Sequence, residues 1–198
     1  MKLVLSINNR TFQFNKYSII FENENFNDVF SRKNNKTLGE TLDHKKYLSL
    51  KHKTIDNYKH MVDMPLGKFV QCLKQKGDNF YKNFLNINGD LTYSKFYLMD
   101  YTIFYKKGIY LYKKLDEIIY IGRCRDSLKK RINYGYGNIT PKNCFKDGQS
   151  TNCHLNYKIT KNKDSIEFYF HELTDNTEII EYENKLIKKY RPKWNIQK

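Results

Sequence analysis

Two short runs of β-branched and aromatic residues constrain the fold of this chain more than any other feature. They are Gly108-Ile109-Tyr110-Leu111-Tyr112 and Ile118-Ile119-Tyr120-Ile121-Gly122. Residues of these types favour β-strands, and five residues between two strands are few enough for a hairpin. The sequence therefore predicts an antiparallel hairpin over residues 108–122.

The alternation within the two runs predicts which side chains share a face. A three-residue loop over 114–116 would place Tyr110 opposite Tyr120, on one face with Tyr112 and Ile118. The opposite face would be apolar and would consist of Ile109, Leu111, Ile119 and Ile121. Paired tyrosines pack within sheets more often than they catalyse reactions, so the pair alone does not establish a function.

From residue 107 onward the pattern predicts the order strand, strand, helix, helix, strand, helix. The expected elements lie at 108–112, 118–122, 128–132, 150–161, 165–173 and 177–190. Asp126 or Ser127 would cap the first helix, and Asp175 or Asn176 the last. This order predicts an α/β (α+β) fold, in which helices flank a small mixed or antiparallel sheet.

The first 106 residues carry weaker signals. A hairpin is expected around Asn8–Arg10, residues 23–46 are expected to be loop, and apolar spacing indicates a helix within 48–85, followed by a strand over 96–105. The apolar face of that helix comprises Leu66, Phe69, Val70 and Leu73. We expect residues 1–106 to be an N-terminal elaboration of a core that spans 107–198.

Charge and composition limit the class of protein. With 36 Lys and Arg against 21 Asp and Glu, the net charge is +15, which favours a polyanionic partner such as nucleic acid. Much of the Lys also fits A/T-rich codon usage, and the surplus is spread along the chain. No run of about 18 apolar residues is present, and the N-terminus does not resemble a signal peptide, so we expect a cytoplasmic protein with no membrane contact. The four cysteines lack zinc spacing and are expected to be free thiols.

A carboxylate falls within the apolar stripe of the last predicted helix. At 100° per residue, Glu183 lies among the side chains of Ile179, Ile180, Leu186, Ile187 and Tyr190. A buried carboxylate costs several kcal/mol unless a cation accompanies it. Glu183 is therefore either half of a buried salt bridge or a metal ligand. Arg131 lies at the edge of its own helix's apolar stripe, where its guanidinium could reach a site.

These residues occur in the order of a known pattern. Gly108-Ile109-Tyr110 and Tyr120-Ile121-Gly122 resemble the defining motif of the GIY-YIG nuclease family. Arg131 lies where that family has its essential arginine, nine residues after Gly122. Glu183, followed by Leu186-Ile187 and then Pro192 and Asn195, is similar to the family's acidic helix and closing asparagine.

The resemblance implies hydrolysis of a DNA phosphodiester with one divalent cation, Mg²⁺ or Mn²⁺, held by Glu183. Arg131 would donate hydrogen bonds to the phosphate oxygens, and Tyr110 would take a proton from water, with its pKa lowered by Arg131 and the metal. Tyr120 would orient the water or the phosphate. Gly108, Gly122 and Asn195 would support the site structurally.

The chain departs from the family pattern four residues after the arginine, where relatives have His or Tyr and this sequence has Gly135. Tyr134 or Tyr136 would supply the hydroxyl instead. Arg123 and Lys130 are candidate DNA contacts. Gln149-Ser150-Thr151-Asn152 and His154 could also bind DNA, or could simply form an N-capping turn with a surface histidine.

The motifs lie at the C-terminal end of the sequence, which resembles the family's type II restriction endonucleases. These act as homodimers on double-stranded DNA. Residues 1–106 and the loop 133–150 would then provide base recognition and dimer contacts. The alternatives are a phage or mobile-element endonuclease of loose specificity, or a non-catalytic DNA-binding protein on a decayed nuclease fold.

Overall fold

The computed structural model describes residues 2–7 and 9–196. It divides into two compact units. Unit 1 comprises Met1–Asn23, Ser94–Asn138 and Lys158–Lys198, and unit 2 comprises Glu24–Tyr93 and Ile139–Tyr157. Because both units contain residues from before position 107, this division differs from the expected boundary between residues 106 and 107.

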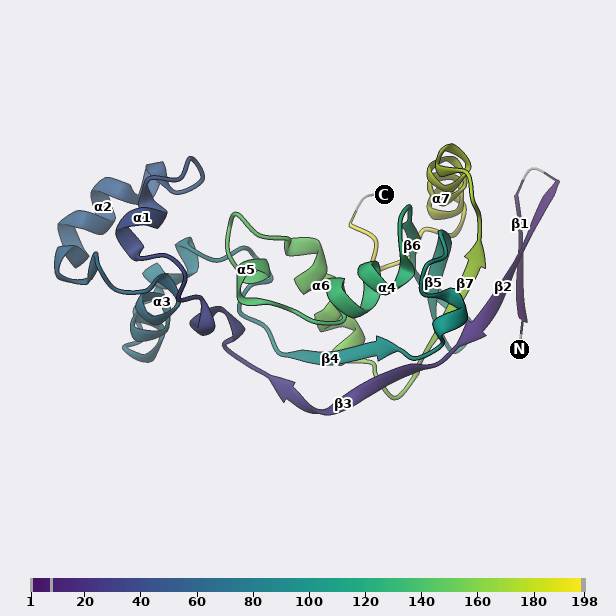
Figure 1. Ribbon diagram of the computed structural model, residues 1–198, viewed down its shortest axis with the longest axis horizontal. Coiled ribbons are helices and arrows are strands. Elements are labelled where there is room, and N and C mark those ends of the chain that lie inside the picture. Colours follow the sequence, from purple (N-terminus) through teal and green to yellow (C-terminus); the bar gives the residue numbers. More distant parts are fainter. Residues whose placement is uncertain (1, 8, 197–198) are drawn as a thin grey trace. The chain divides into compact units, whose positions relative to one another are not determined.

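Unit 1 contains a five-stranded sheet in the order β1-β2-β7-β5-β6, with each neighbouring pair antiparallel (Figure 1). The strands are β1 (Lys2–Ile7), β2 (Arg10–Tyr17), β7 (Ile166–Glu172), β5 (Gly108–Lys114) and β6 (Glu117–Cys124). The predicted hairpins at both ends of this order are confirmed. Asn9 in the first turn has a φ of 61°, a conformation that asparagine tolerates better than most residues, and Asn8 lies outside the described residues.

The pairing of β5 with β6 corrects the predicted register. Tyr110 lies opposite Gly122, and Tyr112 lies opposite Tyr120, a shift of two residues. A shift of two keeps Tyr110, Tyr112 and Tyr120 on one face, so the tyrosines still lie together. The register changes after Tyr112 because β6 bulges at the next residue. As a result Ile118, rather than Ile119, packs with the apolar core of the sheet.

The apolar face of the sheet forms the core of unit 1 against α7 (Asn176–Tyr190). This core contains Leu5, Ile7, Phe12, Phe14, Ile109, Leu111, Ile121, Tyr169, Leu173, Ile179 and Leu186. The side chain of Asp175 caps α7 by accepting a hydrogen bond from the Glu178 amide. Of the two predicted caps, Asp175 and Asn176, Asp175 is therefore the correct one. The first strands of the chain thus share one core with its last helix.

A short helix follows β6. It consists of α4 (Leu128–Arg131), capped by the Ser127 hydroxyl, and one π-helical segment, Ile132–Tyr136. The predicted helix over 128–132 is confirmed at its start, and Ser127 rather than Asp126 is the cap. The amide of Gly137 donates to the carbonyl of Ile132 at 2.8 Å, an i to i+5 bond that contains one residue more than an α-helical turn.

Unit 2 is mainly helical and has its own aromatic core. Its helices are α1 (Leu38–Leu42), α2 (Leu48–Tyr58), α3 (Leu66–Gln75) and α5 (Pro141–Cys144), and α6 (Ser150–Thr160) begins in it. The predicted apolar face of α3 is buried. The expectation of loop over 23–46 was wrong in part, because this stretch contains the end of β3 (Ile19–Phe26) and α1. Thr37 and Glu40 form a capping box that stabilises so short a helix.

Two buried polar groups also connect elements of unit 2. The Tyr47 hydroxyl, almost fully buried, donates a hydrogen bond of 2.6 Å to the Asp147 carboxylate. The Lys33 ammonium lies 4.0 Å from the same carboxylate. Burial raises the pKa of Asp147, but the Tyr47 hydrogen bond and the Lys33 charge outweigh burial, so the pKa is below its ordinary value.

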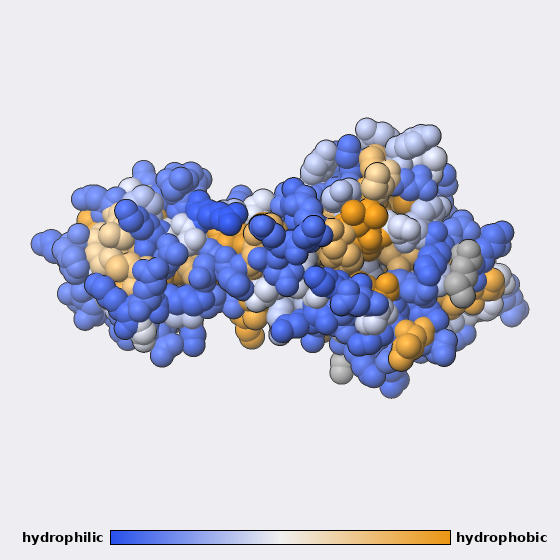
Figure 2. Space-filling model, turned by 90° about the horizontal axis from the view of Figure 1, so that it is seen from below, coloured by the Kyte–Doolittle hydropathy of each residue, from blue (hydrophilic) through white to orange (hydrophobic). Residues whose placement is uncertain are grey.

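β4 (Tyr93–Leu98) pairs with β3, and a single 3₁₀ turn, Tyr101–Ile103, follows. The predicted strand over 96–105 thus ends at Leu98. On the face seen in Figure 2, hydrophilic residues cover most of the surface and hydrophobic ones form separate patches. Among the described residues, no helix combines the length and apolar character needed to cross a membrane. All four cysteines are free, as predicted.

Candidate active site

The side chains of Tyr110 and Arg131 meet on the tyrosine face of the sheet. Arg131, at the end of α4, donates its Nε–H to the Tyr110 hydroxyl at 3.0 Å. Tyr110 is fully buried, and its ring centroid lies 6.1 Å from that of Tyr120 and 6.1 Å from that of Tyr136. The fold therefore brings together four of the predicted catalytic residues, Tyr110, Tyr120, Arg131 and Tyr136.

Gly122 creates the space that the tyrosines occupy. A Cβ atom at this position would lie 2.7 Å from the Tyr110 hydroxyl and 2.7 Å from the Tyr120 ring. Gly108 has a φ of 151°, and a Cβ there would lie 2.0 Å from the carbonyl oxygen of His171 on β7. Glycine is thus required at Gly122 for packing, and at Gly108 both for packing and for a positive φ that other residues rarely adopt.

The π-helical segment explains the departure at Gly135. The segment is kinked at Gly135, whose φ of −97° and ψ of −115° are not helical, and the extra residue in the turn brings Tyr136 rather than its neighbours to the tyrosine face. The Tyr136 ring is fully buried, lies 5.5 Å from the Arg131 guanidinium, and its hydroxyl lies 3.0 Å from that of Tyr112. Tyr134 is 66% exposed. Of the two predicted alternatives, Tyr136 is therefore the one that joins the cluster.

The pKa of Tyr110 is raised above its ordinary value, because burial penalises the phenolate more than the Arg131 charge stabilises it. Burial raises the pKa of Tyr120 and Tyr136 in the same way. The predicted lowering of the Tyr110 pKa is opposite in direction to this net shift. The Arg131 charge does lower the pKa of Tyr110, as predicted, but burial outweighs it. Without other cations nearby, Tyr110 is a neutral phenol at pH 7.

Glu183 is buried in the middle of α7, as the helical stripe predicted, and its carboxylate forms an ion pair with Arg123 at the end of β6. Burial raises the pKa of Glu183, and the nearby Arg123 and Arg131 partly offset the rise. Of the two predicted alternatives for Glu183, the structure contains the salt bridge, with Arg123 as its partner. Arg123, predicted as a DNA contact, is the cation that accompanies this carboxylate.

The residues around Glu183 fit a hard divalent cation. Among the described residues there is no group of three or more His, Cys, Asp or Glu side chains that could hold a metal ion. A single buried carboxylate suits Mg²⁺, which keeps several waters and needs few protein ligands. Glu183 is the residue that would hold it.

The segment that includes Asn195 covers the outer edge of β6. The Asn195 side chain accepts a hydrogen bond of 3.0 Å from the Ile121 amide and donates one of 2.8 Å to the Ile121 carbonyl. The Trp194 amide donates to the Ile119 carbonyl at 2.9 Å. These contacts satisfy backbone groups that an edge strand would otherwise expose.

The other predicted DNA contacts lie elsewhere. Lys130 is exposed and pairs with Asp126 at 2.9 Å. Residues 149–154 belong to unit 2, where Asn152 is buried and donates a hydrogen bond to the Gln149 side chain at 2.6 Å. Ser150 accepts one of 3.0 Å from Asn88, while Thr151 is exposed and His154 is half-buried. The contacts of Gln149, Ser150 and Asn152 described here are thus with neighbouring residues of unit 2, and none of them is with the cluster around Tyr110.

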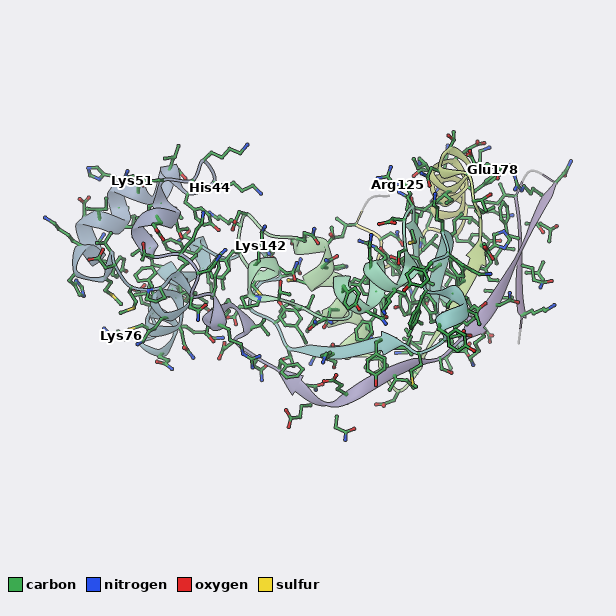
Figure 3. All side chains as sticks on the ribbon, viewed as in Figure 1. His44, Lys51, Lys76, Arg125, Lys142 and Glu178 are labelled. Atoms are coloured by element: carbon green, nitrogen blue, oxygen red, sulfur yellow. The ribbon has the colours of Figure 1, made fainter. Side chains whose placement is uncertain are left out.

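One member of the cluster was not among the predicted site residues. Tyr112 is fully buried and its hydroxyl contacts that of Tyr136. The alternation along β5 placed Tyr112 on the correct face, but no sequence signal predicts a partner across the π-helical segment. Figure 3 shows the crowding of side chains around β5, β6 and β7, with Arg125 and Glu178 labelled at the same end of unit 1.

Comparisons with known proteins agree with this geometry. Residues 106–197 match the family model described as the GIY-YIG catalytic domain. The UvrABC system protein C of Fusobacterium nucleatum subsp. nucleatum is 36% identical over 91 residues, which are 45% of this chain and 13% of that protein. No solved structure matches the chain.

The fold agrees as well, since an antiparallel sheet flanked by helices is the architecture expected of a GIY-YIG nuclease. The predicted fold class is thereby confirmed, and the two matches support a DNA endonuclease. The residues of both glycine-tyrosine triplets, the arginine and the glutamate all lie inside the matched segment. Residues 106–197 therefore resemble a GIY-YIG catalytic domain both in sequence and in fold.

Proposed function

We propose that this chain is a metal-dependent DNA endonuclease that hydrolyses a phosphodiester bond at the Tyr110–Arg131 cluster. The observation that carries the proposal is the hydrogen bond from Arg131 to Tyr110, formed within a segment that matches a catalytic domain. A half-buried arginine that contacts a buried tyrosine hydroxyl, beside a buried carboxylate, is an unusual arrangement for a purely structural core.

Arg131 would bind the scissile phosphate. Its Nε–H is engaged by Tyr110, which holds the guanidinium plane in place and leaves the two terminal nitrogens to donate to phosphate oxygens. The pKa of Arg131 is raised, chiefly by the neighbouring Tyr110, so the guanidinium stays charged at any pH at which the fold exists. A fixed positive charge of this kind stabilises charge that develops on the phosphoryl oxygens.

Tyr110 would position the attacking water. As a neutral phenol its oxygen accepts the Arg131 hydrogen bond and one from the Tyr120 hydroxyl, which leaves its own O–H to donate to water or phosphate. Proton removal by a phenolate requires further positive charge near the hydroxyl, since burial holds the pKa of Tyr110 above its ordinary value.

Glu183 would hold the divalent cation, Mg²⁺ or Mn²⁺. The bound cation would supply Lewis-acid stabilisation of the phosphate and of the leaving oxygen. Arg123, freed from its ion pair with Glu183, would then be able to contact the DNA backbone.

The biological role that we favour is a type II restriction enzyme that cuts a specific site in double-stranded DNA as a homodimer, with base recognition by residues 1–106 and 133–150. The net charge of +15 supports a DNA partner, and unit 2 offers helices outside the catalytic sheet. Gln149, Ser150, Thr151, Asn152, His154 and Lys130 remain proposed DNA contacts.

Cleavage of supercoiled plasmid DNA with Mg²⁺ tests the proposal. Wild type should cut, and Glu183→Gln and Tyr110→Phe should reduce the rate by about 10²-fold or more, the usual scale for losing such groups. Tyr169→Phe is a matched control, since this buried tyrosine lies on the other face of the same sheet and bonds Glu167 at 2.9 Å. Discrete fragments would support a restriction enzyme, and a smear would favour loose specificity. If wild type binds DNA but does not cleave it with any of several divalent ions, the chain is not an endonuclease.

A further inference from the structure

Three exposed tyrosines lie on two neighbouring segments of unit 1. Tyr101 is 78% exposed, Tyr105 is 79% exposed and Tyr134 is 66% exposed. Single exposed aromatic residues are ordinary, whereas several on adjoining segments indicate a binding surface. Tyr101 begins the 3₁₀ turn after β4 and Tyr105 follows the turn, and Tyr134 belongs to the π-helical segment after Arg131.

Hydrogen bonds hold these two segments together. The Asn133 side chain accepts a bond of 2.9 Å from the Leu98 amide and donates one of 3.1 Å to the Leu98 carbonyl. The Phe104 carbonyl accepts from the Lys129 amide at 3.0 Å and from the Ser127 hydroxyl at 2.8 Å. The exposed tyrosines thus project from a backbone that is fixed on both sides.

A cation lies between the two segments. The Lys129 ammonium is 4.9 Å from the ring centroid of Phe104 and 5.5 Å from that of Tyr134. We call Tyr101, Phe104, Tyr105, Lys129 and Tyr134 the aromatic rim. The same segments carry Lys106, Lys107, Arg125 and Lys130 against Asp100 and Asp126. Lys106 pairs with Glu172 at 2.5 Å and Lys130 with Asp126 at 2.9 Å, so the positive charge beside the aromatic faces comes mainly from Lys107, Arg125 and Lys129.

This combination selects the chemistry of the partner. Aromatic rings stack on the flat faces of unpaired bases, and cations beside them neutralise the phosphates of the same strand. The centre of a protein–protein interface is instead depleted of charged residues, lysine among them, so a lysine between the aromatic rings favours a nucleic-acid partner.

We propose that the aromatic rim stacks unpaired nucleobases of the DNA strand that flanks the cleaved phosphate. The inference rests on the proposed function for the position of that phosphate. Lys129 and Arg131 belong to the same helix, α4, whose diameter with side chains is about 10–12 Å, so a strand that contacts Arg131 can reach the rim within a few nucleotides. The substrate would then be DNA that is locally single-stranded or distorted next to the cut.

Binding of a fluorescent single-stranded oligonucleotide to the full chain, in EDTA and without added metal, tests the inference. Tyr101→Ala with Tyr105→Ala, and separately Tyr134→Ala, should weaken binding by about tenfold, the scale of one lost stacking contact. The corresponding Tyr→Phe variants should bind as wild type, because they keep the ring. Leu115→Ala is the control, since Leu115 is exposed in the β5–β6 turn of the same unit. Equal thermal midpoints would show that each variant is folded.

Several outcomes would overturn the inference. Alanine variants that bind the oligonucleotide as tightly as wild type would exclude stacking on the rim. An equal loss in the Phe variants would show that the hydroxyls act rather than the rings. If the alanine variants changed only the oligomeric state, measured by light scattering, the rim would be a contact between copies of the chain.

The same variants separate this inference from the proposed function. If the alanine variants cleave plasmid DNA and bind the oligonucleotide as wild type does, the result rejects the aromatic rim and supports the endonuclease. If the wild-type chain never cleaves DNA but its alanine variants bind the oligonucleotide more weakly, the result supports the aromatic rim and rejects the endonuclease.

Discussion

Arg123 donates to the carboxylate of Glu183 at the edge of the catalytic sheet, and the two residues reach this contact from β6 and from α7. Glu183 is buried, whereas the Arg123 side chain is 37% exposed. A guanidinium and a divalent cation both neutralise the same carboxylate. The ion pair is therefore a competitor of the metal that Glu183 is proposed to hold.

Removing the competitor should tighten metal binding. We expect Arg123→Gln to bind Mn²⁺ several-fold more tightly than wild type, because the cation no longer displaces a partner of the carboxylate; partly exposed ion pairs are worth about 1 kcal/mol. Titration followed by electron paramagnetic resonance, without DNA, measures this. Arg10→Gln is the matched control, since Arg10 pairs at 2.6 Å with Glu178 on the same helix. Weaker or unchanged Mn²⁺ binding by Arg123→Gln would contradict the competition.

The Asp147 carboxylate in unit 2 should make stability depend on pH. Its pKa is lowered in the folded state, so it contributes stability above the unfolded pKa of about 3.9, and this contribution is lost as the pH falls through the lower folded value. Asp147→Asn should therefore cost about 1 kcal/mol of unfolding free energy at pH 7 and progressively less in acid. Urea unfolding between pH 3 and 7 measures the difference. Asp116→Asn, at an exposed turn, should show little change at any pH.

Gly122→Ala should disrupt the site more than the fold. The added methyl group would lie 2.7 Å from the Tyr110 hydroxyl, so both tyrosines must move and the Arg131 contact must lengthen. Overpacking of this kind costs roughly 1–3 kcal/mol of stability, and we expect cleavage to fall at least tenfold. Gly39→Ala provides a comparison, because the nearest atom to its methyl group would be in the Val62 side chain, at 3.1 Å, followed by the Val62 carbonyl oxygen at 3.4 Å. Normal cleavage by Gly122→Ala would show that the tyrosine positions do not matter.

Deleting Gly135 should be tolerated. The π turn places Tyr136 where an α turn would place a residue one position earlier, so the deletion should let an α-helix carry the same tyrosine to the same place. We expect the free energy of unfolding to change by about 1 kcal/mol or less. Inserting one alanine after Gly135 should instead cost about 3–5 kcal/mol, because Tyr136 leaves its buried position. Thermal and urea unfolding compare the two, and similar losses in both would refute the equivalence.

Residues whose roles depend on local pattern were predictable from the sequence. The stripe on α7 placed Glu183 correctly among buried neighbours, and alternation placed Tyr110, Tyr112 and Tyr120 on one face. The register was not predictable, because the bulge in β6 depends on the two-residue turn and on packing beneath Ile118. The choice between Tyr134 and Tyr136 required the π turn, which has no sequence signature.

Pairing over long distances along the chain escaped prediction in a different way. Arg123 and Glu183 are sixty residues apart, and the ion pair exists only because β6 and α7 pack together. The short α1 was missed because its stability comes from the Thr37–Glu40 capping box and not from an apolar stripe.

The pairing of β2 with β7 has a consequence for how the chain matures during translation. The hairpin of β1 and β2 is synthesised first, but its partner strand emerges from the ribosome about 150 residues later. Until then β2 has a free edge, and its buried Phe12 and Phe14 have no helix to cover them. Such distant pairing is slow, so the nascent chain must pass through a stage in which this hairpin is open to wrong partners. The core of unit 1 is thus complete only when the last helix joins the first strands.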